Sequence, residues 1–213
     1  MLDCRKLSRT LAPVAVVTVV AVTAFATQAP AAKAAGCAYG SMSQAFMPWA
    51  DISNYFLAPG ANFENGLGGW TATGGAAVVS GNEPYNVGAS GSHSLALPTT
   101  AASATTPVFC VSVDAPTFRV FVKNNGLNGM YDGQLAVYLN YQGANGRPQT
   151  VKIAGLKTNN RNWNLTAPIS FLQYLSTPLA TSGYANISFT FVPNDNHGSW
   201  QIDDMYVDPC KSR

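Results

Sequence analysis

The carboxylates nearest the C-terminus are the side chains of this chain with the clearest capacity for chemistry. Asp203 and Asp204 are adjacent in residues 199–209, where Trp, Ile, Tyr and Val predict a β-strand. Successive residues of a strand point to opposite faces, so one of the two acids should face the interior. A buried carboxylate needs hydrogen-bond donors, an opposite charge or a metal ion, which makes this strand a candidate site.

Catalytic machinery is not indicated by the other reactive side chains. Glycosidases need two carboxylates about 5–10 Å apart in a cleft, and no pair of acids in this chain suggests that arrangement. His93 and His197 are the only histidines, and no Gly-x-Ser-x-Gly, His-x-x-x-His or Cys-x-x-Cys motif is present. The sequence therefore predicts a protein that is not an enzyme. A small secreted hydrolase built from residues distant in sequence is the alternative.

Residues 1–35 are typical of a signal peptide. Three basic residues among the first nine precede an apolar run over residues 11–26, and small residues near Ala34 offer a cleavage site. The run is short for a membrane span, so we expect cleavage and a secreted, extracellular protein rather than a retained anchor helix. A lipid anchor on Cys37 is a further alternative, because Ala34-Ala35-Gly36-Cys37 loosely resembles a lipobox.

The leader also carries most of the positive charge. It holds four of the 12 basic residues and one of the 10 acidic ones, so the remainder has eight and nine, a formal charge of −1. No basic patch is left to indicate nucleic acid as a partner. Scarce charge, with abundant small and polar residues, favours an extracellular all-β domain with no membrane span after cleavage.

Three cysteines remain after the leader, an odd number for an oxidising compartment. Cys110 lies in the apolar segment 108–113. We expect a Cys37–Cys110 disulfide that pins the N-terminal segment to the domain and leaves Cys210 near the end of the chain. A Cys37–Cys210 bridge is the alternative. A disulfide closing so long a loop stabilises by about 2–4 kcal/mol.

Alternation of apolar and polar residues predicts the fold. It is clearest in residues 117–123, 134–141 and 184–192, each with one apolar and one mostly polar face. Turn-rich linkers separate the strands, and no long helical period is present. The pattern predicts one all-β domain, an antiparallel β-sandwich of the jelly-roll type. The expected boundaries are an irregular lead-in with a short strand over 36–58, the sandwich over 59–210 and a tail over 211–213.

If the three clearest strands share a sheet, their polar sides together form one face on which a ligand could bind. Aromatic rings pack on the apolar faces of sugars, while amides and hydroxyls bond the sugar hydroxyls, so we expect a polysaccharide or cell-surface glycan to bind there. The alternative is a solvated face on which Phe121 and Tyr138 form an ordinary cross-strand pair. The predicted ligand-binding residues are Arg119, Phe121, Tyr138, Asn140, Ser188 and Thr190.

Two end motifs carry a resemblance to a known family. Residues 63–70 (Phe-Glu-Asn-Gly-Leu-Gly-Gly-Trp) and 200–207 (Trp-Gln-Ile-Asp-Asp-Met-Tyr-Val) resemble elements that lie side by side in jelly-roll carbohydrate-binding modules with a galactose-binding-like fold. The chain is also similar, over about residues 37–210, to small uncharacterised secreted proteins from actinobacteria. The resemblance implies a glycan-binding domain. A structural or surface-interaction protein without a glycan site is the alternative.

The resemblance also implies a structural calcium ion where the two end motifs meet. Carried over by residue, its ligands would be the side chains of Asp203 and Glu64, with backbone carbonyls near Asn62 and from the loop around Ser92–His93. Ca²⁺ prefers such hard oxygen ligands. Asp203 would then face inward toward the turn at Glu64, and Asp204 outward. Without a metal, Asp203 would instead accept backbone N–H groups from the turn at residues 62–66.

Overall fold

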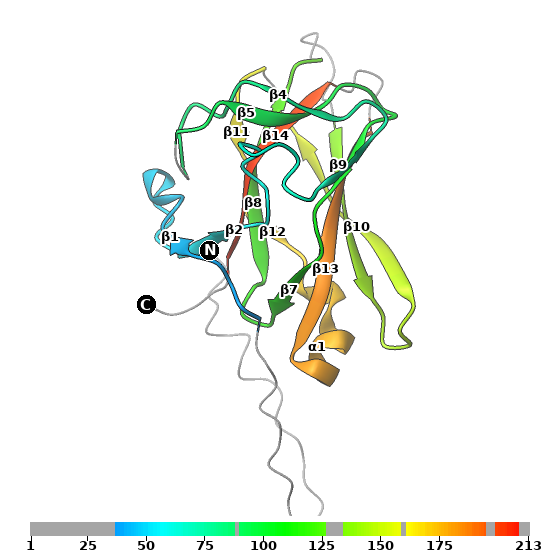
Figure 1. Cartoon of the computed structure of the whole chain (residues 1–213). Coiled ribbons are helices and arrows are strands. Elements are labelled where there is room, and N and C mark those ends of the chain that lie inside the picture. The colour runs from blue at the N-terminus through cyan, green and yellow to red at the C-terminus, as the bar shows by residue number, and fades with distance from the viewer. Residues whose placement is uncertain (1–36, 88–89, 127–133, 159–160, 195–198, 209–213) are drawn as a thin grey trace, which may run out of the picture. The chain divides into compact units, whose positions relative to one another are not determined.

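Two antiparallel sheets face each other in the computed structural model, which describes residues 37–87, 90–126, 134–158, 161–194 and 199–208 (Figure 1). Signal cleavage and Cys210 lie outside these residues, whereas the sulfur of Cys37, the residue of the alternative lipid anchor, is bonded to that of Cys110. The elements, in chain order, are β1 (Met42–Ser43), η2 (Met47–Trp49), β2 (Tyr55–Leu57), β3 (Thr71–Thr73), β4 (Ala77–Ser80), β5 (His93–Leu97), β6 (Ser103–Thr105), β7 (Phe109–Ser112), β8 (Thr117–Asn124), β9 (Gln134–Gln142), β10 (Pro148–Lys157), β11 (Asn164–Leu165), β12 (Ile169–Ser170), η3 (Leu172–Tyr174), α1 (Ser176–Ser182), β13 (Tyr184–Pro193) and β14 (Trp200–Asp208).

Sheet A is built around β14. One edge of β14 pairs with β8, and its other edge pairs first with β5 and then with β2. The strands β4 and β1 extend the sheet beyond β5 and β2, while β11 and β12 pair with the far edge of β8. Sheet B has the order β10-β9-β13-β6-β3, and β7 also pairs with β13. The chain crosses between the sheets repeatedly, which is the jelly-roll form of an antiparallel β-sandwich.

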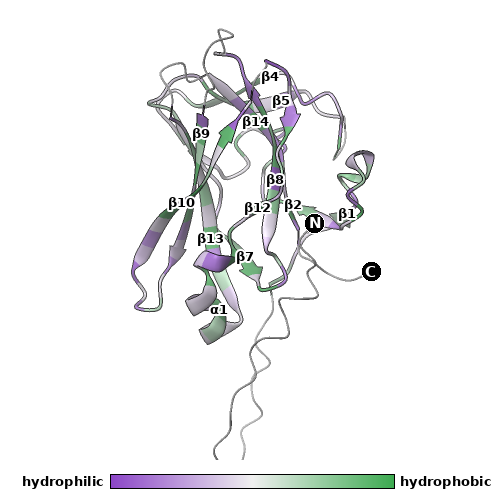
Figure 2. Cartoon of the chain, turned by 180° about the vertical axis from the view of Figure 1, so that it is seen from behind, coloured by the Kyte–Doolittle hydropathy of each residue, from purple (hydrophilic) through white to green (hydrophobic). Residues whose placement is uncertain are grey.

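Apolar faces of the alternating strands meet between the sheets. Phe118 of β8 and Phe189 of β13 lie 4.6 Å apart by ring centroid, and both are fully buried. Trp200 and Ile202 of β14 belong to the same core. Figure 2 shows hydrophobic and hydrophilic residues alternating along β9 and β10, as expected for strands with one buried face.

The part of the N-terminal lead-in between β1 and β2, residues 44–54, covers the outer face of sheet A. Phe46 and Tyr55 of this segment form a second buried cluster with Phe121 of β8 and Tyr206 of β14. A Cys37–Cys110 disulfide attaches the lead-in to β7, which confirms the expected pairing. Phe121, which alternation assigned to a solvent-exposed face, is therefore covered by the lead-in.

The strand predictions are confirmed for β8, β9, β13 and β14, but one expectation about them is wrong. The three clearest strands do not share a sheet, because β8 belongs to sheet A whereas β9 and β13 belong to sheet B. Residues 169–175 form the two-residue β12 and the 3₁₀ helix η3, followed by the short helix α1. Among the described residues, no helix has both the length and the hydropathy needed to cross a membrane.

Candidate functional site

The predicted ligand-binding residues are divided between opposite sides of the sandwich. Arg119 and Phe121 lie on β8 in sheet A, whereas Tyr138 and Asn140 lie on β9 in sheet B. Ser188 and Thr190, the remaining two, lie on β13, also in sheet B. Phe121 and Tyr138 are therefore not a cross-strand pair. Alternation correctly identified the faces of each strand, but it does not say which strands are neighbours.

Phe121 is unavailable to a ligand, because its exposed fraction is 0%. Its ring lies 5.7 Å from that of Trp49 and 5.5 Å from that of Tyr85, measured between centroids, and it stacks on Tyr85. Phe46 covers it from the lead-in. Aromatic contacts of this kind add about 0.5–1.5 kcal/mol each beyond burial, so Phe121 serves packing rather than recognition.

Arg119 is likewise committed to contacts within the chain. Its Nη1 donates to Asp51 Oδ2 at 3.1 Å, its Nε donates to the carbonyl of Thr166 at 2.9 Å, and its guanidinium lies over the ring of Phe46. Burial alone would raise the pKa of Asp51, but hydrogen bonds from Tyr55 and Ser53 and the charge of Arg119 outweigh it and lower that pKa. Both predicted ligand residues of sheet A are thus removed from the candidate site.

Residues of sheet B remain together and form a hydrogen-bonded row across the sheet. Asn140 Nδ2 donates to Thr190 Oγ1 at 2.9 Å and to Ser188 Oγ at 3.3 Å. The hydroxyl of Thr150 donates to Asn140 Oδ1 at 2.8 Å, and the hydroxyls of Thr105 and Thr190 lie 2.8 Å apart. The row therefore crosses β10, β9, β13 and β6. Of these residues, sequence reasoning missed Thr105 and Thr150, since both are on strands with weak alternation.

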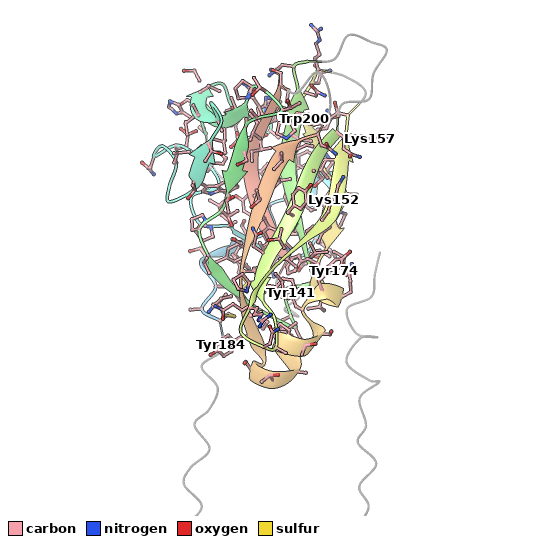
Figure 3. The ribbon with its side chains drawn as sticks, turned by 90° about the vertical axis from the view of Figure 1, so that its right-hand side faces the viewer. Tyr141, Lys152, Lys157, Tyr174, Tyr184 and Trp200 are labelled. Atoms are coloured by element: carbon pink, nitrogen blue, oxygen red, sulfur yellow. A yellow bond between two sulfur atoms is a disulfide. The ribbon has the colours of Figure 1, made fainter. Side chains whose placement is uncertain are left out.

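Tyr138 stands beside this row on the same face. In the register of sheet B it pairs with Lys152 on one side and with Thr190 on the other. Lys152 in turn donates to Gln134 Oε1 at 3.1 Å. Figure 3 views this side of the molecule and shows Lys152 and Lys157 along β10. One partly exposed ring, amides, hydroxyls and lysines thus occupy the outer face of sheet B.

The adjacent aspartates of β14 lie at a β-bulge. The register of β14 on β8 shifts between Asp203 and Tyr206, and Asp204 has a φ of 44°. That left-handed conformation is uncommon for a residue other than glycine. Asp203 is 0% exposed and Asp204 is 4% exposed. Asp203 pairs with Phe121 of β8 and therefore shares the covered outer face of sheet A, so the expectation that Asp203 faces the core between the sheets is wrong; alternation holds only for an unbroken strand.

A third buried acid, Glu83, was not predicted as part of this site. Its backbone N–H donates to Asp203 Oδ2 at 3.1 Å, and the N–H of Asp204 donates to Asp203 Oδ1 at 2.9 Å. The carboxylate of Glu83 accepts the backbone N–H groups of Tyr85 and Val87. Asp203 is thus held by the loop after β4, and the expected donors at residues 62–66 do not supply these bonds.

Asp203, Asp204 and Glu83 have no nearby positive charge among the described residues that would offset theirs. Burial raises the pKa of Asp203 to about 8, with a further contribution from the charge of Asp204. Burial and the charges of Glu83 and Glu64 raise the pKa of Asp204 to about 7. Among the described residues, no lysine or arginine forms an ion pair with Glu83 or with either aspartate. The site therefore favours a bound proton or an added cation.

Glu64 lies at the edge of this group, in a tight turn. Its Oε1 accepts the N–H groups of Ser92 and His93 at 2.8 Å each, and its Oε2 accepts the hydroxyl of Ser92 at 3.1 Å. Burial would raise the pKa of Glu64, but these hydrogen bonds and that of the His93 side chain lower it to about 2. The side chain of Asn62 forms no hydrogen bond within the described residues.

The oxygen atoms around these acids are of the types that bind calcium, but in this structure they are not arranged around one common point. No three His, Cys, Asp or Glu side chains in the described part of the chain lie together closely enough to hold a metal ion. A Cβ on Gly91 would collide with Asn82 Oδ1 and approach Glu64 Oε1, so these two oxygens are neighbours. Ser94 Oγ, next to His93, is buried without a hydrogen-bond partner in the described residues. Carboxylate, amide and hydroxyl oxygens are the ligand types that Ca²⁺ takes.

Comparisons with known proteins found similarity only among solved structures: no family model matches this chain, and no curated protein does. A xylan-binding family 22 carbohydrate-binding module from Paenibacillus barcinonensis is 16% identical, with 72% of this chain and 94% of that one covered and a TM-score of 0.47. A second family 22 xylan-binding domain is 17% identical, covering 76% and 99%, at a TM-score of 0.45. A family 61 module solved with β-1,4-galactotriose is 18% identical, covering 70% and 94%, at a TM-score of 0.38.

Proposed function

We propose that this protein is a non-catalytic glycan-binding domain and that the outer face of sheet B is its binding surface. The row formed by Thr105, Thr190, Asn140 and Thr150 beside Tyr138 is the observation that carries the proposal. Three gaps between neighbouring strands of about 4.8 Å make the row about 14 Å long, which suits an extended chain. The proposed ligand is therefore a polysaccharide.

The chemistry of the row supports this choice of ligand. Each hydroxyl has one donor and two acceptor positions, and the hydrogen bonds within the row do not use all of them. They do fix the orientation of the amide of Asn140, which lowers the entropy lost on binding. The ring of Tyr138 supplies a partly exposed apolar surface for the C–H face of a sugar.

A binding role without catalysis is supported by the positions of the perturbed acids. Asp203, Asp204 and Glu83 are the buried carboxyls of the described residues that face one another, and none is accessible to a polymer. A glycosidase requires its two carboxylates in an open cleft. We also propose secretion, which the Cys37–Cys110 disulfide supports, since such bonds persist in oxidising compartments.

Affinity electrophoresis through gels containing soluble neutral polysaccharides tests the proposal. We expect at least one polymer to retard the protein, and Asn140→Ala and Tyr138→Ala to reduce that retardation about tenfold, as loss of about 1.4 kcal/mol implies. Tyr85→Ala is the matched control, because that exposed tyrosine stacks on Phe121 at sheet A. Absence of retardation by every polymer, or equal retardation of all variants, would contradict the proposal.

The second candidate is a surface-interaction protein without a glycan site. It is favoured by one observation: every member of the row already has a hydrogen-bond partner within the sheet. For such a protein the Asn140→Ala variant would lose stability and leave all polysaccharide mobilities unchanged. The same electrophoresis, combined with a melting curve, separates the two functions.

We further propose a structural Ca²⁺ at the acid cluster, held by Asp203 and Glu64 with help from Asp204 and Glu83. Bound calcium would supply the positive charge that these carboxyls lack. The raised pKa values of Asp203 and Asp204 and the unpaired hydroxyl of Ser94 support the proposal. A backbone carbonyl near Asn62 remains a proposed ligand from the family resemblance.

A further inference from the structure

A cavity of about 350 Å³ lies beside the hairpin of β9 and β10, next to Asn140 and Thr150 of the row described above. It is a depression open to solvent, with the turn between β9 and β10 on one side and η3 and the start of α1 on the other. Its volume is at the small end of the range of about 300–1,000 Å³ that is usual for ligand sites. The lining residues are Tyr141, Gly143, Ala144, Asn145, Gln149, Tyr174, Thr177 and Pro178.

Two tyrosines form the aromatic part of this cavity. Tyr141 is on β9, and Tyr174 ends η3; both are partly buried and contact the main core. Tyr141 pairs with Gln149 across the hairpin and with Ile187, a core residue, so its ring lies on the inner side of sheet B. Figure 3 shows both labelled tyrosines beside α1. The cavity and the row of Asn140 are therefore on opposite faces of the same hairpin.

The polar residues that line the cavity are uncharged, and most of their side chains are free to bond a ligand. The hydroxyls of Tyr141, Tyr174 and Thr177 and the amide of Gln149 form no hydrogen bond with other described residues. The amide of Asn145 is oriented by the backbone N–H of Arg147, which donates to its Oδ1 at 3.0 Å. Amphipathic rings with neutral donors and acceptors match a ligand that has both apolar faces and hydroxyl groups.

The backbone around the cavity is fixed before a ligand arrives. Gly143 N–H donates to the carbonyl of Arg147 at 2.9 Å and Gly146 N–H to the carbonyl of Gly143 at 2.9 Å, which close the hairpin turn. The N–H of Tyr174 donates to the carbonyl of Phe171 at 3.1 Å, which fixes η3. Phe171 itself is fully buried in the core. A site on such anchored segments loses little entropy on binding.

We propose that this cavity is a second, separate binding site that takes a short neutral saccharide, either free or as the end of a longer chain. Recognition would combine contact with the rings of Tyr141 and Tyr174 and hydrogen bonds to Gln149 and Thr177. A charged sugar would find no countercharge among the lining residues. The proposal shares the ligand class of the proposed function, but it rests on different residues.

Saturation-transfer NMR with the purified protein tests the cavity. The probes are neutral mono-, di- and trisaccharides of glucose, galactose, mannose and xylose, each tried free and with its reducing end methylated. We expect transfer to at least one probe, and about a tenfold loss of affinity in Tyr174→Ala or Gln149→Ala. Tyr184→Ala is the matched control, because Tyr184 is an exposed tyrosine near α1 that does not line the cavity.

The row variants separate this proposal from the proposed function. Tyr138→Ala should reduce polysaccharide retardation about tenfold and leave transfer to the short saccharides unchanged. Loss of signal on methylation would show that the site binds the reducing end of a chain. An unchanged signal would show that it binds the sugar ring without contacting that end. Both outcomes support binding at the cavity. Absence of transfer to every probe, or equal affinity in Tyr174→Ala, Gln149→Ala and the parent protein, would overturn the proposal even if polysaccharide retardation persists.

Discussion

Arg119 Nη1 lies 3.1 Å from Asp51 Oδ2, and this contact joins residues 68 positions apart in the chain. It connects the middle of β8 to the lead-in, and the hydroxyl of Tyr55 donates to the same carboxylate oxygen at 2.7 Å. The side chains of Arg119 and Asp51 are only 11% and 15% exposed. Arg119, which the sequence predicted to bind a glycan, thus holds the covering segment of residues 44–54 against sheet A.

Replacing Arg119 with alanine should destabilise the protein by about 1.5–3 kcal/mol, because a charged hydrogen bond is lost and the carboxylate of Asp51 stays partly buried. Urea unfolding followed by tryptophan fluorescence measures this change. Lys123→Ala is the control on the same strand, since Lys123 forms no ion pair among the described residues. Equal midpoints for the two variants would show that the contact has no stabilising role. Polysaccharide binding should persist in both.

Calcium should raise the melting temperature, because a ligand that binds only the folded state stabilises it by mass action. Differential scanning calorimetry with excess Ca²⁺ and then with chelator measures the shift. A concentration of 100 times the dissociation constant corresponds to about 2.7 kcal/mol. Asp203→Asn should remove the response, whereas Asp114→Asn, on an exposed turn, should keep it. An unchanged midpoint in the parent protein would refute the calcium site.

Chelator-treated protein should become more stable as the pH falls from about 8 to about 5. The folded-state pKa values of Asp203 and Asp204 are raised to about 8 and about 7, above the ordinary value of 3.8. Between those limits the folded chain binds more protons than the unfolded chain, so acid favours folding. Below about pH 4.5 the trend should reverse, because the pKa of Glu64 is lowered to about 2 and its stabilising contribution is lost.

Melting curves across this pH range check the prediction. Asp203→Asn should be less sensitive to pH between 5 and 8, because one of the two titrating carboxyls is gone. Saturating Ca²⁺ should flatten the same region in the parent protein, since the metal would replace the protons. A chelated parent protein with constant stability from pH 5 to 8 would show that these acids are not forced to take up protons.

Removing the disulfide should cost about 2–5 kcal/mol of stability. The paired Cys37→Ser and Cys110→Ser variant avoids a lone thiol and is compared with the parent protein by urea unfolding. Because the bridge attaches only the lead-in to β7, the β-sheet circular dichroism should remain. A variant with an unchanged midpoint would show that the contacts of Phe46 and Asp51 hold the lead-in without the bridge.

Local patterns predicted the strands well because each strand has one face in the core. Alternation placed Phe118, Val120 and Val122 inside, and all three are buried. The sheet to which β8 belongs could not be predicted, since alternation is a property of one strand and pairing joins strands far apart. Phe121 was assigned to an open face because the lead-in that covers it has no regular period.

The acid cluster was only partly predictable, for a related reason. The composition of β14 indicated a buried acid, and Asp203 is one. The bulge at Asp204 has no sequence signal such as glycine, so its burial could not be inferred. Glu83 had one available signal: an acid directly before Pro84 in a loop between strands. Its partner is 120 positions away, which local reasoning does not reach.

The Cys37–Cys110 bridge closes a covalent ring, and the two cysteines are 73 positions apart in the chain. The lead-in, the turn that carries Glu64 and the loop that carries Glu83 all lie inside that ring. A protease that cuts the exposed segment at Pro84–Asn86 would therefore leave one covalently joined molecule, which separates into two only under reducing conditions. Resistance to separation after a single cut in this segment is thus a consequence of where the bridge lies.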